Sequence, residues 1–483
     1  MIRAGTFRAW LALVAVVVAA CTGTSPTPEP SASGEASASA EPTPADLSAR
    51  PLSWFAPLPP LPTGPGREYI GSEDFLNLFE AGAPWEQAAE RIDVFKLYGE
   101  WVDFTTAGQL ETAVAGIGER GMVLGVEAGP LDPPAECGHG VEGFAGSDSG
   151  RRLASRIRAA GGTLQVIALD EPWYFAHVYD GPQACHWTVE QVAEGVAAFV
   201  AAVREEFPWV LVGDIEPTPD PVSAAGLAEW MAAYEAAVGE PMAFLHLDLD
   251  WSQPDWSALA LEVQAAGDAR GVPTGIIYTG GAAPSDELWM GLAGQRVLDH
   301  EDRDGGAPDH VVFQSWNDHP DFSLPETDAL AFTGFMNRYF DDRSSLGLAG
   351  TSTSLAFRRP TVVSAALADA PADHAVDGDP DTLWNAGAGP PAWIEIDLGE
   401  ARALSLIRLY VGQSPEGATE HRVYGRADAG GAGTLLGTLA GATSDYQVLE
   451  LAAALWSPVR FVRIETVASP SWVAWREIEI EGN

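Results

Sequence analysis

The chain has 483 residues, and 26 Lys and Arg stand against 68 Asp and Glu, so the formal charge at pH 7 is −42. Such acidity excludes nucleic-acid binding through the phosphates, because like charges repel. Hydrophobic residues make up 46% and charged residues 19%, which excludes bulk disorder. Three cysteines are too few for a disulfide scaffold. The length is enough for two or three domains.

Residues 1–21 are typical of an export signal. Arg3 and Arg8 precede an apolar run from Trp10 to Ala20, which has signal-peptide length and is too short to span a bilayer comfortably. The sequence Val-Ala-Ala-Cys ending at Cys21 resembles a bacterial lipobox, which implies lipidation of Cys21. The alternative is an ordinary signal peptide with a chance cysteine. The resemblance implies an extracytoplasmic protein that touches the cell membrane only through a lipid anchor.

Residues 22–48 consist mainly of Ser, Pro, Ala, Thr and Glu, with almost no large apolar residues. Such a segment cannot bury enough surface to offset its ordering entropy, so we expect a disordered linker. Outside the cytoplasm, the two remaining cysteines lie in an oxidising compartment. We therefore expect a disulfide between Cys137 and Cys185.

In residues 49–345, strand-like apolar runs alternate with helix-like stretches such as Thr188–Phe207 and Ala224–Val238. Eight such units predict a (β/α)8 barrel, and no Gly-rich dinucleotide motif follows any of the strands, which disfavours a doubly wound sheet. The predicted strands are Ser53–Ala56, Val94–Trp101, Met122–Glu127, Leu164–Asp170, Val210–Glu216, Ala243–Asp250, Pro273–Tyr278 and His310–Trp316.

Several of these strands alternate apolar and polar residues, which places each polar set on one face. In the predicted strand Ala243–Asp250, for example, His246, Asp248 and Asp250 lie on one face and leucines lie on the other. The leucine face of a barrel strand packs under the helices, so we expect every polar face to point toward the barrel axis. An antiparallel sheet with one wet face is the alternative, and the intervening helices disfavour it.

The predicted barrel mouth gathers carboxylates and aromatic residues, the combination that glycoside hydrolysis uses. Lys96 is the only lysine of the chain, which indicates either a required ammonium group or a chance survivor. The expected mouth residues are Lys96, Tyr98, Glu100, Glu127, Asp170, Glu171, Asp214, Glu216, His246, Asp248, Asp250, Tyr278, Gln314 and Trp316.

Competing hydrolase classes lack their motifs. No His-x-His or His-Glu-x-x-His sequence occurs among the nine histidines, so a zinc site is disfavoured. The Gly-x-Ser-x-Gly elbow of serine hydrolases is also absent from the sequence. A carboxylate-bound calcium or magnesium ion remains an alternative. For the glycosidase we expect no catalytic cofactor.

Asp170-Glu171-Pro172-Trp173 resembles the Asn-Glu-Pro segment of clan A glycoside hydrolases. This resemblance implies that Glu171 is the acid/base and that Trp316 lies under the first sugar subsite. The strand-seven nucleophile of the clan has no counterpart, because that strand ends Tyr278-Thr279-Gly280. The partner carboxylate is then sought among Glu216 (the leading candidate), Asp214, Asp248, Asp250 and Glu127.

A second resemblance, to α-galactosidase-like barrels, places catalytic aspartates on strands four and six. It implies Asp170 together with Asp248 or Asp250. The barrel as a whole resembles glycoside-hydrolase-like bacterial proteins, and a barrel that binds glycan without cleaving it is the rival hypothesis. In either case we expect Lys96 and His246 to orient the sugar or to tune the acids.

Residues 350–483 change to short alternating strands, typical of a β-sandwich. Two segments, Ala375–Trp384 and Trp393–Gly399, resemble a discoidin domain (coagulation factor 5/8 type C), as do the later His421–Gly425 and Trp475–Ile480. In bacterial surface enzymes such domains are usually carbohydrate-binding modules of family 32. The resemblance therefore implies a carbohydrate ligand.

The discoidin resemblance also implies a structural Ca²⁺, whose hard oxygen ligands match the residue types present. Carried onto this sequence, the ligands are Asp377, Asp379, Thr382 and Glu477, and an ordinary Asx-rich turn is the alternative. Sugar contacts are expected from Trp472, His421 and Arg426, unless these residues serve packing. We thus expect a glycoside-hydrolase-like enzyme with a sugar-binding module, or alternatively a cell-surface adhesion protein without catalysis.

Overall fold

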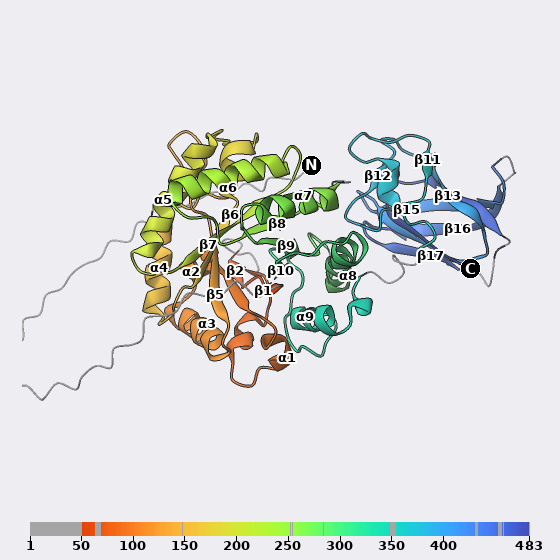
Figure 1. Cartoon of the computed structure of the whole chain (residues 1–483). Helices are drawn as coiled ribbons and strands as arrows, with labels where there is room; N and C mark the ends of the chain where they lie inside the picture. Colours follow the sequence, from red (N-terminus) through yellow and green to blue (C-terminus); the bar gives the residue numbers. More distant parts are fainter. Residues whose placement is uncertain are drawn as a thin grey trace, which may run out of the picture.

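The computed structural model describes residues 51–62, 69–146, 148–251, 253, 255–283, 285–347, 354–429, 433–452, 456 and 458–482. The predicted export signal, Cys21 and the linker at 22–48 lie outside these residues. A two-domain arrangement is visible in Figure 1, with a barrel in red to green and a sandwich in blue. Within the described residues, no helix is long and apolar enough to cross a membrane.

Eight parallel strands close into a barrel, so the predicted fold class is confirmed. All eight predicted strands are present, in the order β1-β10-β9-β8-β7-β6-β5-β4 around the barrel. Their bounds are β1 Leu52–Ala56, β4 Val94–Tyr98, β5 Val123–Ala128, β6 Val166–Asp170, β7 Leu211–Pro217, β8 Leu245–Asp248, β9 Thr274–Tyr278 and β10 His310–Gln314; a hairpin of β2 Leu61–Pro62 and β3 Tyr69–Ile70 follows β1.

Helices connect successive strands and cover the barrel (Figure 1). Thr106 and Thr188 each form a capping box with the glutamine three residues later, which fixes where α3 and α5 begin. The helices are α1 Glu86–Ala89, α2 Gly99–Phe104, α3 Ala107–Glu119, α4 Ser149–Ala159, α5 Val189–Arg204, α6 Ala224–Val238, α7 Trp256–Asp268, α8 Asp286–Val297 and α9 Phe332–Asp341; shorter turns are η1 Phe75–Phe79, the π-helices η2 Tyr174–Val178 and η3 Leu298–Arg303, and η4 Arg343–Ser345.

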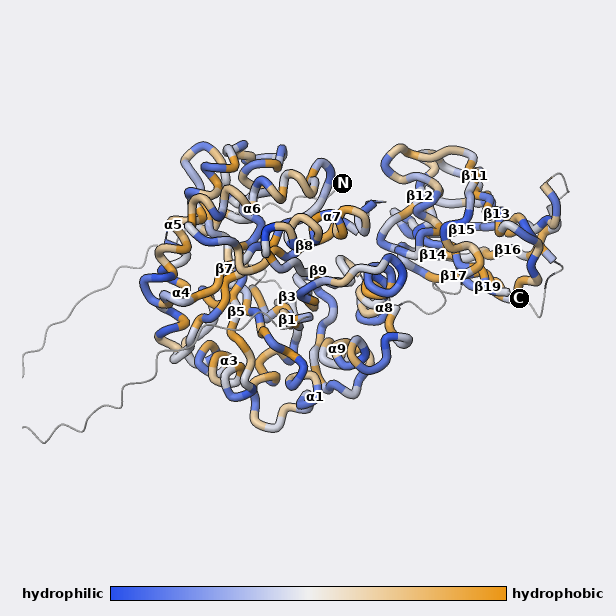
Figure 2. Tube along the Cα trace, viewed as in Figure 1, coloured by the Kyte–Doolittle hydropathy of each residue, from blue (hydrophilic) through white to orange (hydrophobic). Residues whose placement is uncertain are grey.

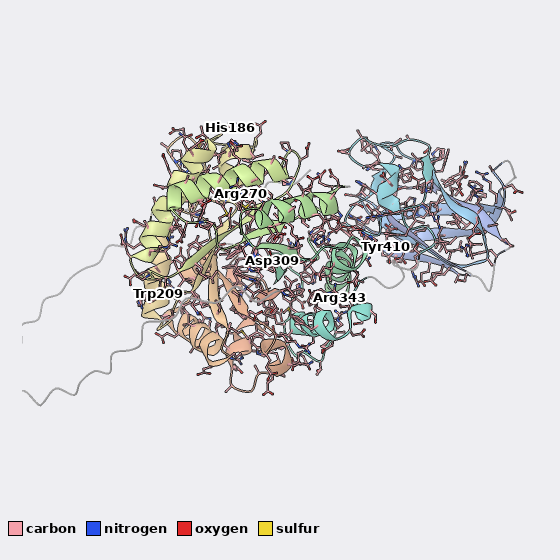
Figure 3. All side chains as sticks on the ribbon, viewed as in Figure 1. His186, Trp209, Arg270, Asp309, Arg343 and Tyr410 are labelled. Atoms are coloured by element: carbon pink, nitrogen blue, oxygen red, sulfur yellow. A yellow bond between two sulfur atoms is a disulfide. The ribbon has the colours of Figure 1, made fainter. Side chains whose placement is uncertain are left out.

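The barrel has two apolar cores, because its strands are buried on both faces. In Figure 2 strands such as β5 and β7 are mainly orange. The inner core includes Trp54, Ile215 and Phe244, and the larger outer core lies under the helices. Asp309, which is labelled in Figure 3, lies just before β10. Its carboxylate accepts a hydrogen bond from the Thr274 amide at 3.0 Å, which ties β9 to β10.

The C-terminal part is a β-sandwich, as predicted. A five-stranded sheet, β11-β13-β18-β15-β16, packs on a four-stranded sheet, β12-β19-β14-β17, around one apolar core. The strands are β11 Thr361–Val363, β12 Trp384–Asn385, β13 Ala392–Arg402, β14 Leu404–Gly412, β15 Gly417–Arg426, β16 Thr434–Thr443, β17 Val448–Ala452, β18 Val459–Ala468 and β19 Ala474–Gly482, with the short helix η6 Ala372–Ala375 before β12.

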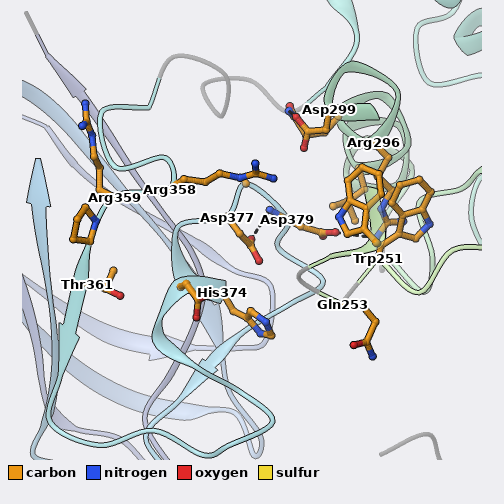
Figure 4. A pocket seen from close by; sticks show the side chains of 16 residues that line it. Trp251, Gln253, Arg296, Asp299, Arg358, Arg359, Thr361, His374, Asp377 and Asp379 are labelled. Atoms are coloured by element: carbon orange, nitrogen blue, oxygen red, sulfur yellow. Dashed lines mark hydrogen bonds and ion pairs between the residues drawn. The ribbon is translucent and has the colours of Figure 1, made fainter. Parts of the chain in front are cut away.

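Arg296 of α8 joins the barrel to the sandwich. It is only 4% exposed, and its guanidinium donates to the Thr279 carbonyl at 2.6 Å and to Asp381 Oδ2 at 2.9 Å. Its side chain also lies over the Trp251 ring, 5.0 Å from the centroid. Beside this contact is a cavity of about 460 Å³ between the two domains (Figure 4). The sandwich is therefore held on the barrel by a buried ion pair.

We expect Arg296→Met to loosen this junction. Removing one partner of a buried ion pair leaves Asp381 and Asp379 without their cation, which we expect to cost about 1–3 kcal/mol. Calorimetry of the variant should then resolve separate unfolding transitions for the barrel and the sandwich. In the unmodified protein these two transitions should overlap more. Arg151→Met, which removes a cation from an exposed pair with Glu205 on the barrel surface, serves as the control. Unchanged calorimetric transitions in the Arg296 variant would contradict the assigned role.

Candidate functional site

A cavity of about 730 Å³ opens at the barrel mouth, where the carboxyl ends of the strands meet. The structure brings eight of the predicted mouth residues to its wall, while Lys96 lies directly beneath them. Those eight residues are Tyr98, Glu100, Glu127, Asp170, Glu171, Asp248, Gln314 and Trp316. The sequence analysis placed Glu100 in the strand Val94–Trp101. In the structure, Glu100 lies instead in the first turn of helix α2.

Lys96 forms the floor of this site. It is fully buried, forms an ion pair with Glu127, and donates to Gln314 Oε1 at 2.5 Å. The Gln314 amide in turn donates to Glu127 Oε2 at 2.9 Å. Above this triad, the Tyr98 hydroxyl donates to the Ser315 carbonyl at 2.7 Å. The lone lysine therefore has a defined place, as the single ammonium group at the base of an acidic cavity.

Glu171 has an unusual backbone conformation. Its φ is +54°, in the left-handed region that side-chain-bearing residues avoid, and the π-helix η2 follows shortly after it. Regular alternation along β6 would send Glu171 to the opposite face from Asp170. The left-handed turn instead lets both consecutive side chains line the mouth. Strained backbone conformations of this kind cluster at functional sites, where they set the position of a side chain.

Three carboxylates meet closely at the mouth. One oxygen from each of Glu142, Asp170 and Glu171 lies within 4.8 Å of the others. The sequence analysis missed Glu142, which lies on the loop between β5 and α4. The available signal was a long loop at the carboxyl end of a barrel strand that carries a glutamate two residues after Gly140 and next to Gly143.

Burial and neighbouring charges change the pKa values of both Asp170 and Glu171. Burial, followed by the charges of Glu142 and Asp248, raises the pKa of Glu171 well above its usual range. Burial and the charges of Glu127 and Glu142 also raise the pKa of Asp170, but Lys96 opposes that rise. Close carboxylates cannot all ionise together, and Lys96 favours the ionised form of Asp170, so the two groups can share one proton. The pair can therefore hold one acid and one carboxylate at the same time.

We expect Asp248→Asn to stabilise the protein above neutral pH. Burial, followed by Glu142 and Glu127, raises the pKa of Asp248 to about 7, whereas the unfolded chain keeps an ordinary value. The folded state thus binds more protons between about pH 4 and 7, and stability conferred by this group is lost as pH rises through that window. The variant should gain on the order of 2 kcal/mol at pH 8, less than the pKa shift alone implies because the Asn amide is also buried.

The measurement is urea unfolding of Asp248→Asn and the unmodified protein at several pH values. The difference between them should shrink toward zero below pH 4. Glu229→Gln, on the exposed face of α6, serves as the control and should show no such trend. A gain that does not depend on pH would contradict the expectation.

The predicted orientation of β7 is wrong. Asp214 and Glu216 are fully buried beneath the helices, and it is Ile215 that lines the mouth. The Trp230 indole of α6 donates to Asp214 Oδ2 at 2.5 Å. Glu216 accepts hydrogen bonds from the Trp173 and Tyr174 amides at 2.8 and 2.9 Å. Since both carboxylates have their partners on the outer side of the strand, neither is placed to meet Glu171 in the cavity. Glu216 instead supports the backbone that follows Glu171.

Three other predicted residues lie away from the mouth cavity. Tyr278 points outward, and its hydroxyl donates to Glu301 at 2.7 Å. His246 does point toward the axis, but it lies deeper, where it hydrogen-bonds His310 at 2.9 Å, and burial lowers its pKa well below the usual range. Asp250 lies past the end of β8 and accepts from Gln253 at 3.0 Å.

Cys137 and Cys185 form a disulfide, with Cα atoms 5.3 Å apart. It joins the loop that carries Glu142 to the segment between η2 and α5, and the Gly138 amide adds a hydrogen bond to the Gln183 carbonyl at 2.8 Å. The bond therefore fixes the loop whose carboxylate faces Glu171.

We expect the double variant Cys137→Ser/Cys185→Ser to lose about 2–4 kcal/mol of unfolding free energy, because a loop of 48 residues is no longer closed. Thermal unfolding with and without reductant checks this. Reductant should lower the unfolding temperature of the unmodified protein to that of the variant. The unfolding temperature of the variant should not change with reductant. A reductant effect of equal size on both proteins would contradict it.

In the sandwich, the four predicted calcium ligands do not all point to the same place. Asp377 Oδ2 accepts from the Thr382 hydroxyl at 2.9 Å, and Glu477 Oε2 accepts from the Gly378 amide at 2.9 Å. Burial, and then the charge of Asp377, raises the pKa of Glu477 well above its usual range. Two buried carboxylates beside a hydroxyl suit a hard cation. The Asp379 carboxylate turns instead toward Arg296.

The three predicted sugar contacts also have different surroundings. Trp472 is 54% exposed and lines a cavity of about 750 Å³ formed by loops of the sandwich. His421 is buried, and its Nδ1 lies 2.9 Å from the Thr466 hydroxyl. Arg426 forms an ion pair with Glu395. Of the three, Trp472 is the one whose side chain is exposed at a cavity wall.

Comparison with known proteins concerns the sandwich. Residues 360–478 match the family model of the F5/8 type C domain. The C-terminal sandwich is an F5/8 type C domain. The match confirms the resemblance drawn from the sequence.

Similar solved structures include chitosan-binding module 1 of a chitosanase/glucanase from Paenibacillus sp. IK-5, with 23% identity, TM-score 0.24, and coverage of 27% of this chain and 98% of that one. Module 2 of the same enzyme, solved with chitotriose, has 27% identity, TM-score 0.23, and coverage of 26% and 99%. The family 32 module of C. perfringens NanJ, solved with galactose, has 18% identity, TM-score 0.22, and coverage of 27% and 95%. Among curated proteins, none matches this chain.

Proposed function

We propose that the barrel hydrolyses glycosidic bonds and that the F5/8 type C domain binds the same class of glycan. The observation that carries the proposal is the closeness of Asp170 and Glu171, whose carboxylate oxygens lie within 4.8 Å inside the mouth cavity. Glycosidases need two such groups, one to protonate the leaving oxygen and one to act on the anomeric carbon.

In this mechanism Glu171 is the general acid. Its burial keeps the proton available near neutral pH. Asp170 is the nucleophile, since Lys96 beneath the site opposes the rise of its pKa. The separation favours direct attack, because retaining enzymes place their carboxyl groups about 5–5.5 Å apart and inverting ones about 6.5–9.5 Å.

Each cycle then proceeds in two displacements. Asp170 attacks the anomeric carbon while Glu171 gives its proton to the departing glycosidic oxygen. Glu171, now a carboxylate, removes a proton from a water molecule, which attacks the glycosyl ester and releases Asp170. Trp316, which lines the same cavity, offers an apolar face for the sugar ring. Glu127 and Gln314 hold Lys96 in place.

The experiment is a reducing-end assay on a panel of polysaccharides, using the chain without residues 1–48, which keeps every described element. Release of reducing ends from at least one polysaccharide supports the enzyme. Binding without release from any of them favours the rival function, a glycan-binding adhesion protein.

The sandwich is tested separately, by Trp472→Ala against Leu435→Ala. Both side chains are about half exposed, but only Trp472 lines the loop cavity. Loss of polysaccharide binding in the Trp472 variant alone supports a sugar platform at that ring. Equal binding in both would move the ligand site elsewhere.

Two further parts of the proposal concern the surroundings of the protein. Asp377, Thr382 and Glu477 would hold a structural Ca²⁺, whose removal by chelator should lower the unfolding temperature of the unmodified protein but not of Glu477→Gln.

Cys21 would carry the lipid anchor outside the cytoplasm. Incorporation of labelled fatty acid that Cys21→Ser abolishes would support the anchor, and labelling of both forms would contradict it.

A further inference from the structure

The mouth cavity carries more negative charge than its own basic residues neutralise. Two of its acids are paired, Glu127 with Lys96 and Asp103 with Arg152. Five other acids at its wall form no ion pair in the described part of the chain: Glu100, Glu142, Asp170, Glu171 and Asp248. Like charges gathered in one cavity repel one another, so a bound positive charge is favoured there.

The five acids come from four different segments. Glu100 lies in the first turn of helix α2, and Glu142 lies on the loop after β5. Asp170 ends β6 and is followed by Glu171, and Asp248 ends β8. A single divalent ion can reach the three carboxylates that lie within 4.8 Å of one another, but it leaves Glu100 and Asp248 uncompensated. Several cationic groups spaced along one ligand can serve all of them.

Glu171 adds an independent observation. Its side chain lines the cavity and is more than nine-tenths buried, since the residue is only 8% exposed. Within the described residues, its carboxylate has no hydrogen-bond donor. A bound glycan can pair with this carboxyl group through its glycosidic oxygen, while its ammonium groups, each with three N–H donors and a full positive charge, pair with the acids around it. Trp316 on the same wall suits an attached sugar ring.

We propose that the mouth binds a glycan with free, protonated amino groups, a polymer of hexosamine units. The proposal rests on the glycan function proposed above and names its substrate class. The net charge of −42 acts in the same direction, because it draws a polycation toward the protein and repels acidic polysaccharides.

The test is calorimetric titration at pH 6 with two hexasaccharides, β-1,4-linked glucosamine and its fully N-acetylated counterpart. Both are titrated into Trp472→Ala, so that the loop cavity of the sandwich does not dominate. In 50 mM NaCl the amino hexamer should bind at least about tenfold more tightly. Raising NaCl to 500 mM should weaken it by about tenfold, and should change the acetylated hexamer by less than about twofold.

Matched variants locate the effect. Glu142→Gln and Glu100→Gln should each reduce the preference for the amino hexamer several-fold, whereas Glu229→Gln on α6 should leave it unchanged. Equal affinity for both hexamers, or binding of neither, overturns the amino-sugar proposal. Cleavage of the acetylated hexamer alone would do so too, while leaving the glycosidase function intact.

Two remaining outcomes separate this proposal from its neighbours. Tight binding of the amino hexamer without any cleavage supports the ligand class and counts against hydrolysis. Titration with Ca²⁺ and Mn²⁺ addresses the metal alternative. If either ion binds at micromolar concentration, loses that affinity in Glu142→Gln and displaces the amino hexamer, the acids form a metal site and the proposal is overturned.

Discussion

Glu171→Gln should lower the rate of glycan cleavage by about a thousandfold. The amide has nearly the shape of the acid but cannot give a proton to the leaving oxygen, so the first displacement loses its general acid. Binding of the oligosaccharide should remain within a few-fold, because the cavity walls are unchanged. The comparison uses reducing-end release at saturating glycan, with oligosaccharide affinity measured on the same preparations.

A substrate with a good leaving group distinguishes this role from a structural one. An aryl glycoside needs little protonation as it departs, so the variant should lose much less rate on it than on the natural glycan. The pH profile should also lose its alkaline limb, which reports the acid. A uniform loss on both substrates, or less than a tenfold loss on the polymer, would contradict the assignment of Glu171. Glu229→Gln controls for the change of charge.

Lys96→Met should destabilise the fold by about 3–5 kcal/mol. The methionine fills most of the lysine volume but leaves the Glu127 carboxylate and the Gln314 carbonyl oxygen buried without their cation. An uncompensated buried charge costs far more than the pair itself contributes to stability. Urea unfolding at pH 7 measures the loss as a shift of the midpoint.

The double variant Lys96→Met/Glu127→Gln shows whether the loss comes from the orphaned charge. Removing both charges should recover a large part of the stability, because a neutral amide replaces the stranded carboxylate. Activity should stay low in both variants, since Asp170 also loses the cation that favours its ionisation. A double variant no more stable than the single one would contradict the account.

Much of the architecture could be predicted because strand period and burial follow directly from residue type. All eight strands of the barrel, helix α6 with its bounds, and the sandwich were predictable in this way. On β4, β5 and β8 the polar alternation also gave the right face, so Lys96, Glu127 and Asp248 were placed correctly.

The same rule failed on β7 for a physical reason. Alternation places polar residues on one face but does not say whether that face meets the axis or the helices. Asp214 and Glu216 face outward, where an indole on α6 donates to Asp214 and two backbone amides donate to Glu216. Those partners belong to other segments, so no local pattern announces them.

The meeting of Asp170 with Glu171 could not be predicted from periodicity either. It depends on one left-handed residue at the end of β6, and glutamate has no preference for that conformation. Glu142 depends on a long loop that a disulfide holds in place. The carboxylates of the site were therefore visible in the sequence as residues, while their arrangement came from long-range contacts.

The most direct test of the central claim is proton NMR of the first sugar released, recorded before its anomers equilibrate. Because Asp170 and Glu171 present oxygens within 4.8 Å of each other, the account predicts that the product keeps the anomeric configuration of the substrate. A product of inverted configuration would contradict the pairing of Asp170 with Glu171, since inversion needs room for a water molecule between the carboxylates. No product from any glycan in the panel would contradict hydrolysis itself.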